Sequence, residues 1–183
     1  RSAWPAAITA VVLGAALFAV RPLTALDPHA APVLLAAIYL ALFAVSVAPA
    51  LPGAAAATAA HTLHPAVVTA VGAGAVLAVR IMSKPVVLPD RRVVAILLGL
   101  AAAVAEEAYF RRLMHPMLAR AGAAVAIVAG AVLFAAMHYP AYGLAAMPLD
   151  FGAGLLFAWQ RWASGSWAVP AGTHGLANLL ASV

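Results

Sequence analysis

The chain has 183 residues, of which 67% are hydrophobic and 8% charged, and its formal net charge at neutral pH is +5. A soluble domain is roughly 45–50% apolar and about 25% charged, so this composition excludes an ordinary soluble globule. It predicts an integral membrane protein embedded in the lipid bilayer. The basic residues are scattered along the chain, and we expect no nucleic-acid partner. The absence of cysteine excludes disulfides, thiolate metal sites and a cysteine nucleophile.

Seven apolar stretches are long enough to cross a membrane, because a helical span needs about 17–25 residues. They lack the alternation and the ~10-residue length of membrane β-strands, so we expect an all-α, polytopic helical transmembrane bundle with about seven spans. Prolines, glycines and charges separate the stretches, and Pro140 is predicted to end the fifth. The predicted spans are Trp4–Val20, Pro32–Leu51, Pro65–Met82, Val93–Leu118, Ala121–Met137, Tyr142–Trp162 and Trp167–Val183.

The fourth stretch carries two adjacent glutamates and an arginine within an otherwise apolar helix. A charged group at the centre of a span costs at least ~2.5–3.5 kcal/mol. Glu107 and Arg111 are four residues apart, which predicts an ion pair on one helix face. Glu106 points about 100° away from that face, and we interpret it as the free carboxylate of a polar cavity. The alternative is that both glutamates only hold helices together.

Two later stretches carry polar side chains that could meet Glu106. His138 follows the fifth stretch, and His174 and Asn178 share one face of the seventh because they are four residues apart. At 1.5 Å per residue from the intervening turns, all four residues lie within about two helical turns of one another in depth. A cluster inside the membrane is therefore possible. The alternatives are an interfacial histidine at 138 and simple helix contacts by His174 and Asn178.

These side chains are the parts needed for water to attack an amide. A carboxylate shielded by apolar helices can act as a general base near neutral pH. A histidine on the same water can orient it or share its proton. A second histidine and an amide offer donors to a developing oxyanion. The zinc-protease pattern HExxH and the serine elbow GxSxG do not occur in the sequence.

The residue pattern resembles the CPBP (Abi) family of intramembrane proteases, which includes type II CAAX prenyl endopeptidases and bacteriocin-processing enzymes. The resemblance covers about residues 101–183, and it implies an N-terminal helical part at 1–92 and a catalytic core at 93–183. It also implies that Glu106 and His138 activate the attacking water, and that His174 and Asn178 stabilise the oxyanion. The pattern consists of Glu106-Glu107-x-x-x-Arg111, Phe134-x-x-x-His138 and His174-x-x-x-Asn178.

Within this pattern, Glu107, Arg111 and Phe134 are expected to support the site. The resemblance implies a glutamic protease without a cofactor, although members were first described as metalloproteases. Zinc is the alternative, because Glu and His side chains bind it. We favour the metal-free form, since Glu106 cannot serve both as a metal ligand and as an unhindered base.

The expected substrate is a membrane-inserted protein or peptide, and the expected location is a bacterial inner membrane. The small size of the chain favours maturation or C-terminal sorting-signal processing over prenyl-protein processing. Two other functions stay open at this stage. One is a non-enzymatic scaffold or self-immunity protein of the same fold, and the other is a transporter or proton relay that uses the same carboxylates.

Overall fold

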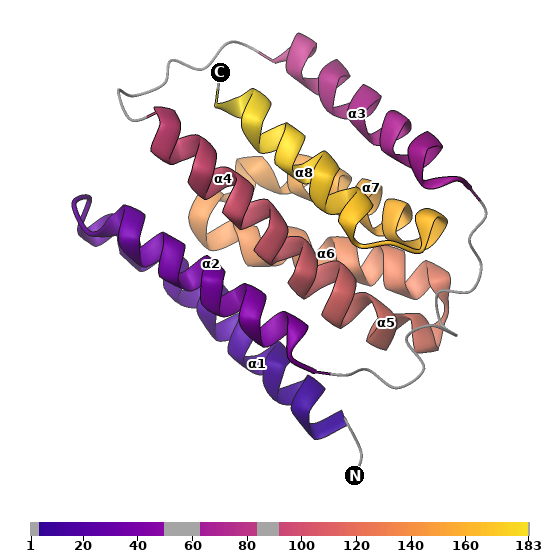
Figure 1. Cartoon of the computed structure of the whole chain (residues 1–183), viewed down its shortest axis with the longest axis horizontal. Helices are drawn as coiled ribbons and strands as arrows, with labels where there is room; N and C mark the ends of the chain where they lie inside the picture. Colours follow the sequence, from indigo (N-terminus) through magenta and orange to yellow (C-terminus); the bar gives the residue numbers. More distant parts are fainter. Residues whose placement is uncertain (1–3, 50–62, 84–91, 183) are drawn as a thin grey trace.

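The computed structural model describes residues 4–49, 63–83 and 92–182, and these ranges fold into helices joined by turns, with no strand among them (Figure 1). Each of the seven predicted spans contains a helix, so the expected helical membrane bundle is confirmed. The predicted ends at Leu51 and Val183 lie outside the described residues. The first elements are α1 (Trp4–Val20), the 3₁₀ helix η1 (Arg21–Leu26), α2 (Ala31–Val47) and α3 (Pro65–Met82).

The second half of the chain begins with one long, irregular helix. Its successive parts are α4 (Arg92–Glu107), the π-helical η3 (Ala108–Met114), α5 (His115–Leu118) and η4 (Ala119–Ala121). The remaining elements are α6 (Ala123–Tyr142), η5 (Leu144–Ala146), α7 (Met147–Ser164) and α8 (Ala168–Ala181).

By length and composition, four helices in the described ranges can cross a membrane: Trp4–Leu26, Pro65–Met82, Val93–Ala121 and Ala123–Tyr142. The sequence predicts about seven spans, and the shortfall has physical causes. α2 and α8 have only 17 and 14 residues. α7 has 18 residues but carries Asp150, Gln160 and Arg161. The shorter and more polar helices therefore belong to the bundle without meeting the length and hydropathy expected of an independent span.

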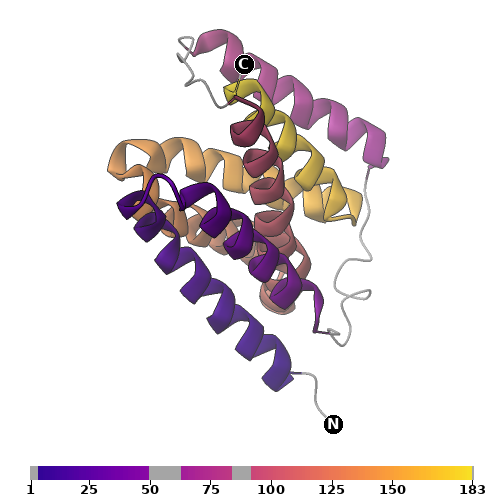
Figure 2. The ribbon, with the colours of Figure 1, turned by 60° about the vertical axis from the view of Figure 1, so that its left-hand side comes forward.

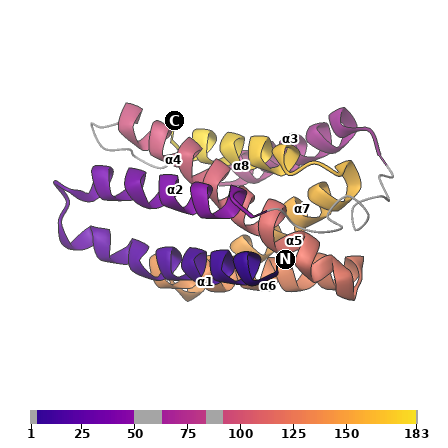
Figure 3. The same cartoon turned by 60° about the horizontal axis from the view of Figure 1, so that its bottom comes forward.

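α4 occupies the middle of the bundle. It lies between α2 and α8, and α3 packs on the far side of α8 (Figure 1). α1 runs beside α2 at the side of the molecule opposite α3 (Figure 2). α6 packs against α7 and also contacts α1, and Figure 3 shows α1 and α6 beneath α2 and α4. The end of α4 and the start of η3 are therefore surrounded by other helices.

The π-helix η3 interrupts the long fourth helix directly after the two glutamates. Its wider turn is seen where the His115 N–H bonds the carbonyl of Phe110, five residues earlier. The Arg111 carbonyl accepts a hydrogen bond from Arg161 Nε of α7 at 3.1 Å. π-Helical turns frequently mark functional sites. The sequence analysis expects an ordinary helix here, because a shifted hydrogen-bond pattern leaves no trace in an apolar run.

The prediction that Pro140 ends the fifth span is wrong, since α6 continues to Tyr142. Proline removes one N–H from the helix, but here it stands in the last turn, where little helix remains to be disrupted. The helix ends instead at Gly143, which adopts φ +75° and whose N–H bonds the Tyr139 carbonyl. As a result His138 lies inside a helix rather than at its end.

α1 approaches the fourth helix closely through a glycine. Tyr109 packs directly on Gly14, where any larger residue would overlap the ring. The Tyr109 hydroxyl donates to the Val11 carbonyl at 2.8 Å. Phe18, one turn further along α1, joins the same aromatic cluster with its ring centre 5.5 Å from that of Tyr109. These contacts set the position of the C-terminal end of α1 beside the glutamates.

Candidate active site

Two adjacent glutamates at the end of α4 form the centre of the site. Glu106 and Glu107 are only 2% and 0% exposed. The sequence analysis expects Glu106 to be a free carboxylate, and the structure corrects this. Both of its oxygens have partners, because Arg21 Nη1 lies 2.7 Å from Oε1 and His138 Nε2 lies 3.1 Å from Oε2. An isolated buried carboxylate would be strongly destabilising, so its burial requires such partners.

The hydrogen bonds of His138 determine where its protons lie. Nδ1 is 2.7 Å from the Phe134 carbonyl, which can only accept, so Nδ1 carries a hydrogen. Nε2 faces Glu106 Oε2, which is also an acceptor when ionised. One proton is therefore shared between His138 Nε2 and Glu106 Oε2. This pair can both release and take up a proton within the buried site.

His174 on α8 contacts both glutamates. Its Nδ1 lies 3.1 Å from Glu107 Oε1, and its Nε2 lies 4.0 Å from Glu106 Oε2. The first distance is a hydrogen bond, and the second is too long for one. Both imidazoles thus direct Nε2 toward the same oxygen, Glu106 Oε2, at 3.1 Å and 4.0 Å.

Glu107 forms the expected ion pair with Arg111, whose Nε lies 3.1 Å from Glu107 Oε2. Both side chains are fully buried. Arg111 Nη2 also donates to the Gly154 carbonyl of α7 at 3.1 Å. Glu107 therefore links the guanidinium to His174, a contact that helical spacing within one segment could not reveal. Through these bonds the Glu107 carboxylate fixes which nitrogen of His174 faces Glu106.

Aromatic rings hold the two histidines in place. Phe134 stacks on His138 with ring centres 4.3 Å apart, and its ring centre is 5.9 Å from that of His174. Phe157 of α7 stacks on the other histidine, His174, at 4.9 Å. Phe134, which the resemblance implies as a supporting residue, lies one helical turn before His138 and contacts both histidine rings. The sequence analysis does not identify Phe157, because nothing in the sequence shows which residues of α7 face α8.

Asn178 lies one helical turn beyond His174 and outside the Glu106 contacts. Its Nδ2 donates to the Gly99 carbonyl of α4 at 2.8 Å, and the side chain is partly buried. This bond ties α8 to α4 two turns before Glu106. The structure thus brings together Glu106, His138 and His174, and it places the Asn178 amide on a neighbouring backbone carbonyl.

Arg21 is a site residue that the sequence analysis does not identify. It lies at the start of η1, is 5% exposed, and reaches Glu106 from the far end of α1. In the sequence it looks like one of the charges that end a span. The sequence offers little signal for it, because Arg111 and Arg112 in the same helix could balance both glutamates, and only the structure shows that Arg112 bonds the Ser46 carbonyl instead.

Zinc is the alternative that the Glu and His side chains leave open. In the part of the chain that the structure describes, no group of three or more His, Cys, Asp or Glu side chains is arranged to hold a metal ion. The Arg21 guanidinium, 2.7 Å from Glu106 Oε1, also places a positive charge where it would repel a cation. The metal-free form of the site stays a prediction.

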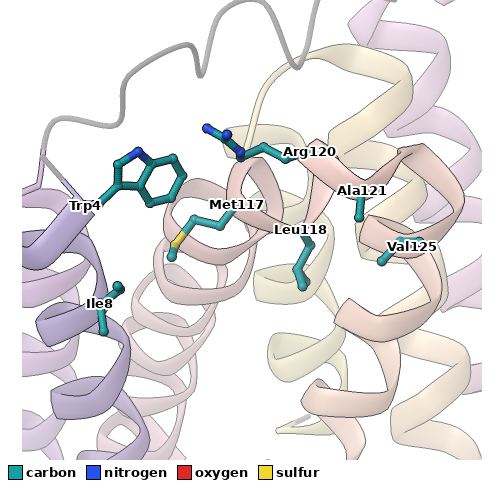
Figure 4. A pocket seen from close by; sticks show the side chains of 7 residues that line it. All are labelled: Trp4, Ile8, Met117, Leu118, Arg120, Ala121 and Val125. Atoms are coloured by element: carbon teal, nitrogen blue, oxygen red, sulfur yellow. The ribbon is translucent and has the colours of Figure 1, made fainter. Parts of the chain in front are cut away.

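A surface groove of about 600 Å³ lies between the start of α1 and the α5–α6 turn (Figure 4). It is mostly apolar, and the Arg120 guanidinium stands 4.7 Å above the Trp4 ring at its edge. Trp4 is 17 residues before Arg21 on a continuous helix, which is about 25 Å. None of the Glu106 contacts lines this groove, so it is separate from the candidate active site.

A comparison with protein-family models finds one match, the type II CAAX prenyl endopeptidase Rce1-like family, over residues 88–180. This range is just over half of the 183-residue chain. The chain belongs to this family. In two further comparisons, no curated protein and no solved structure matches the chain.

Membership of the CAAX endopeptidase family identifies a protease, and the apolar helices identify an integral membrane protein. The expected family is therefore confirmed, and its substrate is a membrane-associated protein or peptide. The matched range contains the two glutamates, both histidines of the cluster and Asn178. Arg21 lies outside it. The division of the chain at residues 92 and 93 stays a prediction.

Proposed function

We propose that this CAAX-type protease is an endopeptidase that hydrolyses a peptide bond near or within the membrane with water activated by Glu106 and His138. The observation that supports this most directly is the convergence of two imidazoles on one carboxylate oxygen. His138 Nε2 and His174 Nε2 lie 3.1 Å and 4.0 Å from Glu106 Oε2. A base, a proton carrier and a second donor thus surround one point shielded from bulk water.

The reaction needs no group beyond these side chains and one water molecule. Glu106 takes a proton from the water as its oxygen bonds to the scissile carbonyl carbon. The carbon–nitrogen bond then breaks, and the leaving amine takes the proton that His138 shares with Glu106. The proton that Glu106 gained restores the shared pair. Water and the amide are thereby converted into a carboxyl group and an amine.

The oxyanion formed in the first step requires hydrogen-bond donors. We assign this role to His174 Nε2 and to the N–H of Asn178 that is not needed for the Gly99 carbonyl. His174 Nδ1 lies 3.1 Å from Glu107 Oε1, and donation from Nε2 to the oxyanion requires that both ring nitrogens carry a hydrogen. The ion pair with Arg111 keeps Glu107 in place for this purpose.

The proposed substrate is a membrane-inserted bacterial protein or peptide, cut during maturation or removal of a C-terminal sorting signal in the inner membrane. We propose the metal-free, glutamic form of the reaction. The burial of the site among apolar helices supports a substrate that reaches it from the membrane. The four membrane-length helices in the described ranges also match a membrane-embedded enzyme.

The test compares cleavage of a quenched peptide library in proteoliposomes by the wild-type chain, Glu106→Gln and the control Asp27→Asn. Asp27 is an exposed carboxylate that accepts the N–H groups of His29 and Ala30. We expect Glu106→Gln to lose at least about 10²-fold in kcat, Asp27→Asn to cleave like wild type, and a chelator to have no effect. Loss of cleavage on chelation, restored by zinc, would instead show a metalloprotease. Wild-type activity in Glu106→Gln would exclude the proposed base and favour a different function.

A further inference from the structure

Arg21 binds one oxygen of Glu106 and leaves the other to the histidines. Its Nη1 lies 2.7 Å from Oε1, whereas His138 and His174 face Oε2. A carboxylate can rotate about its last bond, and rotation would exchange the two oxygens. A strong charge-assisted hydrogen bond to Oε1 prevents this exchange. The guanidinium therefore decides which oxygen of Glu106 is offered to water.

The surroundings of Arg21 hold its guanidinium in a fixed place. It lies against two aromatic rings, 5.6 Å from the centre of Phe18 and 5.4 Å from that of Tyr142. Tyr142 also stacks on His138, with ring centres 5.7 Å apart. The Tyr142 ring thus contacts both Arg21 and His138, and each of these two side chains bonds Glu106. The phenol of Tyr39 on α2 lies within electrostatic reach of the same guanidinium.

The charges of the buried site also require this residue. Glu106 and Glu107 are adjacent in the chain and both are buried. Arg111 Nε and Arg21 Nη1 each lie against one of them, at 3.1 Å and 2.7 Å. Two like charges so close in a poorly solvated site cannot both persist without two counter-charges. Arg21 is the second arginine of the site, and it places a positive charge beside Glu106 as Arg111 does beside Glu107.

We propose that Arg21 is a positioning residue of the protease, supplied by the first helix from outside the family-matched range. It orients the Glu106 carboxylate, and α1 is thereby part of the active unit rather than only a membrane anchor. This inference rests on the proposed function, because it assigns Arg21 a role through the Glu106 base. Arg21 acts on the water only through that carboxylate.

The experiment measures kcat and KM of Arg21→Ala, Arg21→Lys and wild type in proteoliposomes, with and without millimolar guanidinium ion. We expect Arg21→Ala to lose about 10–100-fold in kcat with little change in KM, because a misplaced catalytic group costs rate rather than binding. Guanidinium should restore much of this loss by filling the vacated space. Arg21→Lys should lie between the two, since lysine keeps the charge but not the planar fork.

Arg112→Ala serves as the matched control. Arg112 Nη1 donates to the Ser46 carbonyl at 2.6 Å, and Arg112 is not among the contacts of Glu106 in the described part of the chain. Guanidinium should not raise kcat in this variant, so rescue would be specific to Arg21. If Arg21→Ala does not fold, Arg21→Lys carries the test, and a reduced kcat at unchanged KM supports the proposal.

Two results would overturn the proposal. Wild-type kcat in Arg21→Ala would show that Glu106 needs no such partner. A raised KM with unchanged kcat would show that Arg21 binds substrate instead. Glu106→Gln in the same series separates this failure from that of the proposed function. An inactive Glu106→Gln beside an active Arg21→Ala overturns only the role of Arg21, whereas an active Glu106→Gln overturns the proposed function itself.

Discussion

α3 and the long fourth helix are almost equally apolar, yet they occupy opposite positions in the bundle. Their best membrane-length windows have mean hydropathies of 1.8 and 1.9, but 11% and 44% of those windows is buried. α3 lies at the edge, and α4 lies between α2 and α8 (Figure 1). Hydropathy therefore identifies a helix suited to the membrane without saying where it packs.

Polar side chains account for the difference between the two helices. The fourth helix carries Glu106, Glu107 and Arg111, which are 2% exposed or less. In a bilayer such groups are tolerated only where other helices supply their partners. α3 has only Thr69 and Arg80 as polar side chains with bonding capacity, and its threonine bonds its own helix, at the Pro65 carbonyl. A helix with buried charges is drawn to the centre, and a helix without them can face lipid.

Breaking the buried ion pair should have the largest effect on stability. Arg111→Met leaves Glu107 without its guanidinium in a fully buried position. Removal of one partner of a buried pair costs about 3–5 kcal/mol, so we expect a loss of that size in unfolding by denaturing detergent. Cleavage should fall as well, since Glu107 also bonds His174. The double variant Glu107→Gln with Arg111→Met should recover part of the stability and none of the activity. Wild-type stability in Arg111→Met would show that the pair is not buried as described.

Two glycines on opposite sides of the bundle test the same contrast between packed and peripheral helices, with a smaller expected effect on stability. Gly14 of α1 packs on the buried Tyr109 ring, whereas a methyl group at Gly74 of α3 would meet nothing within 4 Å. Overpacking costs about 1–3 kcal/mol, so Gly14→Ala should be destabilised by that amount. Gly74→Ala is the matched control, and it should be neutral or more stable by about 0.4–1 kcal/mol. Equal effects in the two variants would contradict the packing of α1 on the fourth helix.

The sequence predicts the helices better than it predicts their contacts. The bounds Trp4–Val20 and Pro65–Met82 agree with the structure at both ends, because Pro5 and Pro65 favour a helix start and charged or polar residues follow the apolar runs. The depth count allows Glu106 to meet His138 and His174, but it allows Asn178 equally, and Asn178 bonds the Gly99 carbonyl instead. Depth depends only on distance from a turn, and that distance can be counted along the chain.

Contacts that depend on which helices are neighbours could not be predicted in this way. Arg21 is 85 residues from Glu106 in the chain, and no spacing rule joins α1 to α4. The bond from His174 to Glu107 could not be predicted for the same reason, since α8 could have presented this histidine to either glutamate. The π-helix at Ala108–Met114 changes which residues face α7, and an ordinary helical count misses it.

The smallest expected effect concerns one of the bonds that hold α3 to the bundle, beside the bond from Arg80 Nε to the Leu180 carbonyl of α8. Gln160 of α7 is fully buried, and its Nε2 donates to the Val68 carbonyl of α3 at 3.1 Å and to Thr173 Oγ1 at 2.9 Å. Hydrogen bonds between membrane helices contribute about 0.6 kcal/mol on average and about 1.7 at most. Gln160→Leu also removes Oε1, a buried oxygen with no hydrogen-bond partner in the described part of the chain. We therefore expect a loss of about 1 kcal/mol or less.

This loss should be confined to α3 if that helix is peripheral. Hydrogen exchange should rise in residues 65–82 of Gln160→Leu and stay unchanged at the end of α4, and kcat should stay close to that of wild type. Thr173→Val removes the other partner of Gln160 and serves as the companion variant. A fall in kcat as large as that of Arg111→Met would mean that α3 helps to position the site. The contrast between a central, charged helix and a peripheral, apolar one would then be wrong, because energetic coupling to Glu106 would extend through Gln160 to the edge of the bundle.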